Sequence, residues 1–131
     1  MAMILIIGRY LSNLKAIQDS VPDAISPHCV CIEEKDLLTH AEKVFAAYSD
    51  LKSAVLDITN CPEGVNKSLS SFRDNCPQGV FKIIIHPFQG ALLASLRERY
   101  HSMHFLHLEE VSERLEGFLK KNHLLSKAPS R

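Results

Sequence analysis

Five short apolar runs, each followed by an amphipathic stretch, constrain the fold of this chain more than any other feature of its 131 residues. The runs are MILIIG (3–8), HCVCIEE (28–34), SAVLDI (53–58), VFKIIIHP (80–87) and MHFLHL (103–108). Continuous apolar runs of this length are typical of strands that are buried on both faces of a parallel sheet. Helices are expected between and after them, at 12–21, 35–50, 62–75, 90–100 and 110–125.

This alternation predicts the fold class. Parallel strands joined by right-handed helical crossovers leave few topologies. We expect a flavodoxin-like, doubly wound (βα)5 domain with a parallel five-stranded sheet, strand order 2-1-3-4-5, and helices on both faces. The domain is expected to span residues 1–125, and residues 126–131 are expected to be a tail or the start of a linker to a further module.

Composition and charge narrow the function classes. Hydrophobic residues make up 46% of the chain and charged residues 23%, which is typical of a globular domain. Fifteen basic and fifteen acidic residues balance, so no net field favours nucleic acid or an anionic membrane. The opening MAMILIIGRY lacks the features of a signal peptide, and no apolar run is long enough to span a membrane. A cytoplasmic location is expected.

The four cysteines are expected to be thiols rather than disulfides or zinc ligands. Cys61 and Cys76 stand at the two ends of a predicted helix, and those ends lie farther apart than a disulfide can bridge. Cys29 and Cys31 stand two apart in a predicted strand, and the sequence holds no CxxC pair.

The candidate site lies where the predicted strands end. In open parallel sheets, ligands bind at the carboxyl ends of the strands. Those ends carry Gly8-Arg9, Glu33-Glu34, Asp57, His86-Pro87 and His107-Leu108. Asp57 stands out because a carboxylate interrupts an apolar run and turn-forming residues follow it.

The pattern resembles the receiver domain of bacterial two-component response regulators over nearly the whole chain. ILIIGRYLSNLKAIQDSV is similar to the family's first strand and helix, and HAEKVFAAYSDLKSAVLDITNCPEG to its second helix and phosphoacceptor strand. FKIIIHPF resembles the fourth strand, and HFLHLEEVSERLEGFL the last strand and helix. The resemblance places Asp57 at the phosphoacceptor position.

The resemblance also implies that most of the phosphorylation chemistry is missing. A receiver holds Mg²⁺ with an acidic pair after its first strand, and here those positions are Gly8 and Arg9. The family's switch threonine or serine corresponds to His86, and its phosphate-binding lysine corresponds to Leu108. The expected domain therefore has a degenerate pocket, no metal, no cofactor and no phosphotransfer of its own.

Two interpretations of Asp57 remain open at this level. Arg9 follows the first strand, which neighbours the third, so its guanidinium could pair with Asp57, lower its pKa and replace Mg²⁺. Alternatively, Asp57 accepts hydrogen bonds from backbone N–H groups at the start of the following helix.

Histidines supply a second set of candidates. His101, His104 and His107 are spaced three apart, but in a loop and a strand that spacing does not direct them into one coordination sphere. His86 and His107 are expected to meet at adjacent strand ends, where they could sense pH or accept hydrogen bonds.

Two readings of function follow. The first is a regulatory domain of two-component signalling that is not an enzyme and acts through a protein: a histidine kinase, an output domain or a second copy. The resemblance implies a partner face on the last two helices and the fifth strand, with Arg97, Arg99, Glu113, Arg114 and Glu116. The alternative is a Rossmann-like module that binds a nucleotide or small signalling ligand, with Glu33-Glu34 on the ribose, although the glycine fingerprint is missing.

Overall fold

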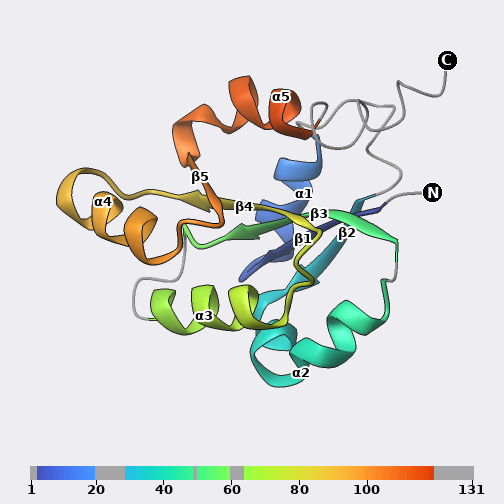
Figure 1. Ribbon diagram of the computed structural model, residues 1–131. Helices are drawn as coiled ribbons and strands as arrows, with labels where there is room; N and C mark the ends of the chain where they lie inside the picture. Colours follow the sequence, from blue (N-terminus) through green and yellow to red (C-terminus); the bar gives the residue numbers. More distant parts are fainter. Residues whose placement is uncertain (1–2, 20–28, 49, 60–63, 120–131) are drawn as a thin grey trace, which may run out of the picture.

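The computed structural model describes residues 3–19, 29–48, 50–59 and 64–119. Its five strands form one all-parallel sheet in the order β2-β1-β3-β4-β5, which confirms the predicted fold class (Figure 1). The strands are β1 (Met3–Gly8), β2 (Cys29–Glu33), β3 (Leu51–Asp57), β4 (Phe81–His86) and β5 (His104–His107). Each strand falls within or overlaps a predicted apolar run. The three inner strands, β1, β3 and β4, are covered on both faces and need few polar positions.

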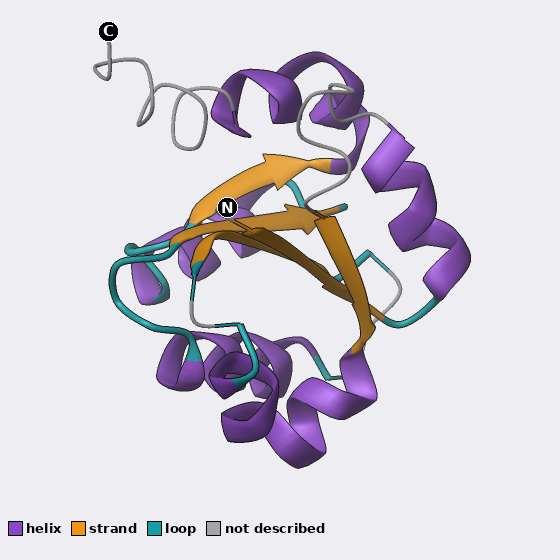
Figure 2. Cartoon of the chain, turned by 90° about the vertical axis from the view of Figure 1, so that its right-hand side faces the viewer, coloured by secondary structure: helices purple, strands orange, loops and turns teal. Residues whose placement is uncertain are grey.

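The helices alternate with the strands as expected. They are α1 (Leu11–Asp19), α2 (Glu34–Ala46), α3 (Val65–Asn75), α4 (Gly90–Arg99) and α5 (Glu116–Leu119). A 3-10 turn, η2 (Leu108–Glu110), and a π-helical turn, η3 (Val111–Leu115), lead from β5 into α5. Figure 2 shows the sheet with helices on both of its faces.

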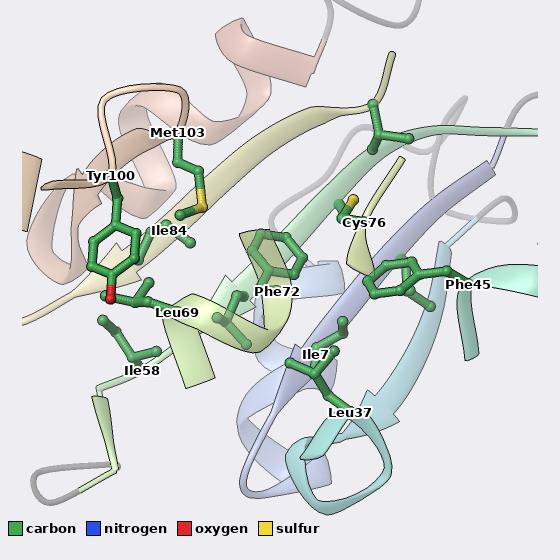
Figure 3. Packing of buried hydrophobic residues seen from close by; sticks show 14 of the residues in the cluster. Ile7, Leu37, Phe45, Ile58, Leu69, Phe72, Cys76, Ile84, Tyr100 and Met103 are labelled. Atoms are coloured by element: carbon green, nitrogen blue, oxygen red, sulfur yellow. The ribbon is translucent and has the colours of Figure 1, made fainter. Parts of the chain in front are cut away.

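Two apolar layers hold the sheet between the helices. On one face, Leu14 and Ile17 of α1 and Leu115 of η3 pack against strand residues such as Ile6 and Ile83. The opposite layer lies under α2, α3 and α4, and Figure 3 shows its packing. Its members in that view include Ile7, Leu37, Phe45, Ile58, Leu69, Phe72, Cys76, Ile84, Tyr100 and Met103. Burial of these two layers is the main favourable term in folding.

The second helix departs most from its expected form. It begins at Glu34, one residue before the predicted start, and ends at Ala46 rather than near residue 50. His40 has φ −138° and ψ 40°, so the helix is interrupted there. Its apolar side chains Leu37 and Phe45 are buried. Of the other positions named from the sequence, Cys61 and the tail 126–131 lie outside the described residues.

The chain after β5 does not enter an α-helix directly. His107 is the N-cap of η2 and its side chain accepts a hydrogen bond from the N–H of Glu109, while Glu110 reaches back to the N–H of His107. This reciprocal capping arrangement fixes the direction in which the chain leaves the sheet. A π-helical segment such as η3 is rare and is found mostly as a single turn.

Candidate functional site

The predicted site residues come together at the carboxyl edge of the sheet. Gly8 is in register with Glu33 on one side and with Asp57 on the other. On the far half of the sheet, His86 is in register with His107. The site therefore has an acidic half around β1 and β3 and an imidazole half around β4 and β5.

Asp57 is buried and is held by the loop that follows it. Its Oδ1 accepts a hydrogen bond from the backbone N–H of Thr59 at 3.0 Å and another from the Thr59 hydroxyl at 2.7 Å. An aspartate that accepts from the N–H two residues ahead closes a turn of its own backbone. Helix α3 begins at Val65 with Gly64 as its N-cap. Asp57 therefore closes a local turn, and the prediction that it caps the helix is wrong.

The pKa of Asp57 is raised above its ordinary value. Burial is the main cause, and the two hydrogen bonds from Thr59 oppose it by stabilising the carboxylate. The negative charge of Glu34 raises the pKa further. The predicted lowering of this pKa by Arg9 is wrong, because desolvation and a second carboxylate outweigh the groups that favour the charged form.

Arg9 pairs instead with the acid at the start of the second helix. Its Nε lies 3.5 Å from Oε1 of Glu34. The other oxygen of Glu34, Oε2, accepts a hydrogen bond of 2.7 Å from the hydroxyl of Ser68 on α3. Glu34 is only 5% exposed, so these contacts offset the cost of burying its charge. They also join the end of β1, the start of α2 and the first turns of α3.

Sequence reasoning missed this bridge and had only a partial signal for it. The sequence marks Glu34 as the second of two acids at the end of a strand, and it predicts that Glu34 belongs to that strand. Because it is the first residue of α2, its side chain turns into the protein, while the side chain of Glu33 lies half-buried on the edge strand. Nothing in the sequence singles out Ser68, which is one of several serines along α3.

The packing around Gly8 explains why no side chain stands there. A Cβ built on this residue would lie 2.6 Å from Cδ2 of Leu14 and 3.3 Å from Cβ of Asp57. Real Cβ atoms essentially never approach another atom as closely as the first distance, and Leu14 is fully buried. An acidic residue at position 8, as in a working receiver, would require the buried side chain of Leu14 to move.

His86 is fully buried at the end of β4. Its Nδ1 accepts a hydrogen bond from the backbone N–H of Phe88 at 3.0 Å. Its ring stacks on Phe88 with 5.9 Å between centroids and meets Phe105 edge to face at 5.7 Å. Burial is the main cause that lowers its pKa to about 4, and the neighbouring His107 and Arg97 lower it further. His86 is therefore a neutral ring at physiological pH.

His107 rather than Leu108 faces His86 at the end of β5. The two rings lie 5.4 Å apart at 85° to each other, which confirms the prediction that these histidines meet. The Nδ1 of His107 accepts from the N–H of Glu109 at 3.1 Å, which confirms the hydrogen-bond acceptor role. Leu108 begins η2 and is 49% exposed, so it does not line the interior of the site.

The hydrogen bonds show which nitrogen of each ring is the acceptor. A nitrogen that accepts from a backbone N–H carries no proton, so each ring is protonated at Nε2. In both His86 and His107 this Nε2 is buried, with no hydrogen-bond partner among the described residues. Neither Nε2 can coordinate a metal while its ring keeps this hydrogen bond, because the ring would have to lose both protons.

The side chains at this edge do not fit Mg²⁺. That ion prefers several carboxylate oxygens in octahedral geometry. Here one oxygen of Asp57 is held by Thr59, and the two oxygens of Glu34 contact Ser68 and the guanidinium of Arg9. Across the described part of the chain, no group of three or more His, Cys, Asp or Glu side chains is arranged to hold a metal ion.

The edge strand β2 borders a separate groove of about 490 Å³. Glu33 and Asp36 line it together with Leu11 and His40, whereas Glu34 does not. The predicted pairing of both Glu33 and Glu34 with a ribose does not fit this arrangement, because Glu34 is turned into the protein and bound there.

The predicted partner face spans the β5 edge of the sheet. Arg97 and Arg99 project from α4 and are exposed. On the other side of β5, Glu113 and Arg114 are exposed on η3, and Glu116 begins α5. Arg114 donates to Glu110 at 3.1 Å, a surface pair of the kind that contributes little to stability. Positive and negative groups are thus mixed along this edge.

Comparison with known proteins supports the fold but identifies no family. No protein-family model matches the chain, and neither does any curated protein. The structure is similar to that of the Legionella pneumophila response regulator LqsR, with a TM-score of 0.65 and 10% sequence identity. The match covers 95% of this chain and 44% of that protein, so the chain spans less than half of its length. Within the described residues, no helix is long and apolar enough to cross a membrane.

Proposed function

We propose that this chain is a receiver-like regulatory domain that acts in the cytoplasm through a protein partner and does not transfer phosphoryl groups itself. The fold that it shares with a response regulator supports the receiver-like part. Its partner would be a histidine kinase, an output domain or a second copy of the chain, bound at the mixed-charge edge formed by α4, β5, η3 and α5.

The observation that carries the proposal is the way the acidic half of the site is occupied. One oxygen of Asp57 accepts two hydrogen bonds from Thr59, and the nearby carboxylate, Glu34, pairs with Arg9. A phosphoacceptor needs an accessible carboxylate beside a divalent cation that neutralises the transferred group. In this chain the guanidinium of Arg9 pairs with Glu34 rather than with Asp57.

The imidazole half supports the same conclusion. The resemblance puts a hydroxyl and an ammonium at this end of β4 and β5 in working receivers. Here the strand ends carry His86 and His107, which pack against one another instead. His86, which is neutral at physiological pH, supplies no positive charge to hold a phosphoryl group. The conformation at the carboxyl ends of the strands would therefore not switch by phosphorylation, and the domain would signal through its surface.

A magnesium titration tests the proposal. We expect amide resonances around Asp57 to show no saturable shift when MgCl₂ is added to ¹⁵N-labelled protein in place of NaCl of equal ionic strength. Asp57→Asn is the control, because it removes the carboxylate and keeps nearly the same shape. Saturable Mg²⁺ binding in the wild type that is lost in Asp57→Asn would contradict the proposal.

A further inference from the structure

The amino-terminal edge of the sheet, opposite Asp57, contains a pocket that the proposed function does not use. Its volume is about 390 Å³, and it lies between the loop that precedes β4 and the loop that precedes β5. Lys82, Arg73, Gln78 and Ser102 supply the polar part of its lining. A volume of this size is within the range of small-molecule sites.

Lys82 is the central group of this pocket. It is only 8% exposed, although an ammonium is costly to bury. Its Nζ donates to the carbonyl of Pro77 at 3.2 Å and to that of Val80 at 3.3 Å. An ammonium has three N–H donors, so two neutral acceptors leave one donor and the whole positive charge uncompensated among the described residues.

The remaining polar lining adds donors rather than acids. Arg73 uses its Nε to bind Asp74 at 2.9 Å and stacks over the ring of Tyr100 at 5.3 Å. Asp74 therefore balances the charge of Arg73, while the terminal N–H groups of the guanidinium have no hydrogen-bond partner among the described residues. Ser102 contributes a hydroxyl. Among the described lining residues there is no carboxylate.

The thiol of Cys76 adds neither a negative charge nor a reactive thiolate to this pocket. Cys76 lines the pocket and is buried. Burial raises the pKa of this thiol to about 11, although the charge of Lys82 opposes that shift. A neutral thiol is a weak nucleophile and a weak acceptor, so it neither compensates the ammonium nor favours covalent chemistry here.

We propose that this pocket binds a small oxyanion, the phosphate or carboxylate group of a metabolite, through Lys82 with Arg73 and Ser102. A convergent set of positive and neutral donors around a concave site selects an anion with several acceptor oxygens. The bound anion would supply the charge that Lys82 lacks. It would also join the two loops at this edge, far along β4 from the His86 end.

A ¹⁵N NMR titration tests the proposal with sodium phosphate and sodium acetate as separate probes. NaCl at equal ionic strength corrects for screening. We expect saturable shifts of amides in residues 77–82 and at Ser102. Tighter binding of phosphate identifies a phosphate site, and tighter binding of acetate identifies a carboxylate site. No saturable shift with either probe, or shifts that NaCl reproduces, would overturn the proposal.

Matched variants assign the binding to the pocket. Lys82→Met removes the charge but keeps the length of the side chain, and we expect it to abolish the saturable shifts. Lys52→Met is the control, because Lys52 is an exposed lysine at the same end of the neighbouring strand. Unchanged affinity in Lys82→Met would overturn the proposal.

Two exposed positions keep the test decisive if Lys82→Met does not fold. Arg73 lies in the last turn of α3 and Ser102 lies in the loop before β5. Both are exposed, so Arg73→Gln and Ser102→Ala should fold. We expect Arg73→Gln to weaken the binding of the preferred probe by about tenfold, as for loss of a charge-assisted hydrogen bond. Wild-type affinity in both variants would refute the assignment.

Discussion

The buried ring of His86 should make folding stability fall steeply in mild acid. An unfolded chain binds a proton at this histidine near pH 6.5, whereas the folded protein does so only near pH 4. Desolvation, His107 and Arg97 disfavour the folded imidazolium, and they outweigh Glu110 and the N–H of Phe88. Because the folded pKa is lowered, this stabilisation is present above pH 6.5 and is lost as the pH falls toward 4.

The size of the effect follows from the two pKa values. A difference of about 2.5 pH units corresponds to roughly 3 kcal/mol, which is lost completely once the pH is below both values. At pH 5, where the unfolded ring is charged and the folded ring is still neutral, about 2 kcal/mol should be lost. Near pH 7.5 the contribution to the pH dependence is negligible.

The perturbation is His86→Gln, which removes the titrating group and keeps an acceptor for the backbone N–H of Phe88. The free energy of unfolding is measured by urea denaturation followed by circular dichroism, at pH 7.5 and pH 5. A packing defect in the variant lowers the free energy of unfolding equally at both pH values. The quantity to compare is therefore the change in this free energy between pH 7.5 and pH 5. We expect the wild type to lose about 2 kcal/mol more than the variant between these pH values.

The matched control is His101→Gln, because His101 is exposed in the loop before β5. This variant should reproduce the wild-type pH profile. Equal pH dependence in wild type and His86→Gln would refute the reasoning, since it would mean that His86 has the same pKa in the folded and the unfolded protein.

Three further substitutions test the acidic half of the site. Thr59→Val should raise the pKa of Asp57 further, because it removes a hydroxyl that stabilises the carboxylate; ¹³C NMR titration of the carboxyl carbon measures this, and Thr59→Ser should restore the wild-type value. Gly8→Ala should lower the free energy of unfolding by about 1–3 kcal/mol, because its Cβ would meet a buried leucine of α1, and an unchanged urea midpoint would contradict that close contact. Glu34→Ala should lower the free energy of unfolding by about 1–3 kcal/mol, because it leaves the buried hydroxyl of Ser68 without its acceptor. Glu33→Ala is the control and should lower the free energy of unfolding by less.

The strands were predictable because their apolar runs are continuous and short. A strand that is buried on both faces of a parallel sheet needs apolar residues at nearly every position, and the positions of β1 and β4 follow from this pattern. The meeting of His86 and His107 was predictable for a related reason, since residues that end adjacent parallel strands must lie side by side.

The choice of partner for Arg9 was not predictable from spacing. Arg9 follows β1, and an acid stands at or just after the end of each neighbouring strand. Only the tertiary structure determines which of the two acids Arg9 contacts. Asp57 closes a turn with Thr59, and Glu34 lies at a helix start next to Ser68. The interruption of α2 at His40 also has no sequence signal, because neither proline nor glycine stands there.

The most direct test of the central claim is the intact mass of the protein after incubation with acetyl phosphate and MgCl₂. A working receiver gains a phosphoryl group on its strand-end aspartate under these conditions. We predict that the mass stays that of the unmodified chain, because Asp57 is buried against Thr59 and the nearby carboxylate is paired with Arg9. Addition of one phosphoryl group in the wild type, absent in Asp57→Asn, would contradict the account.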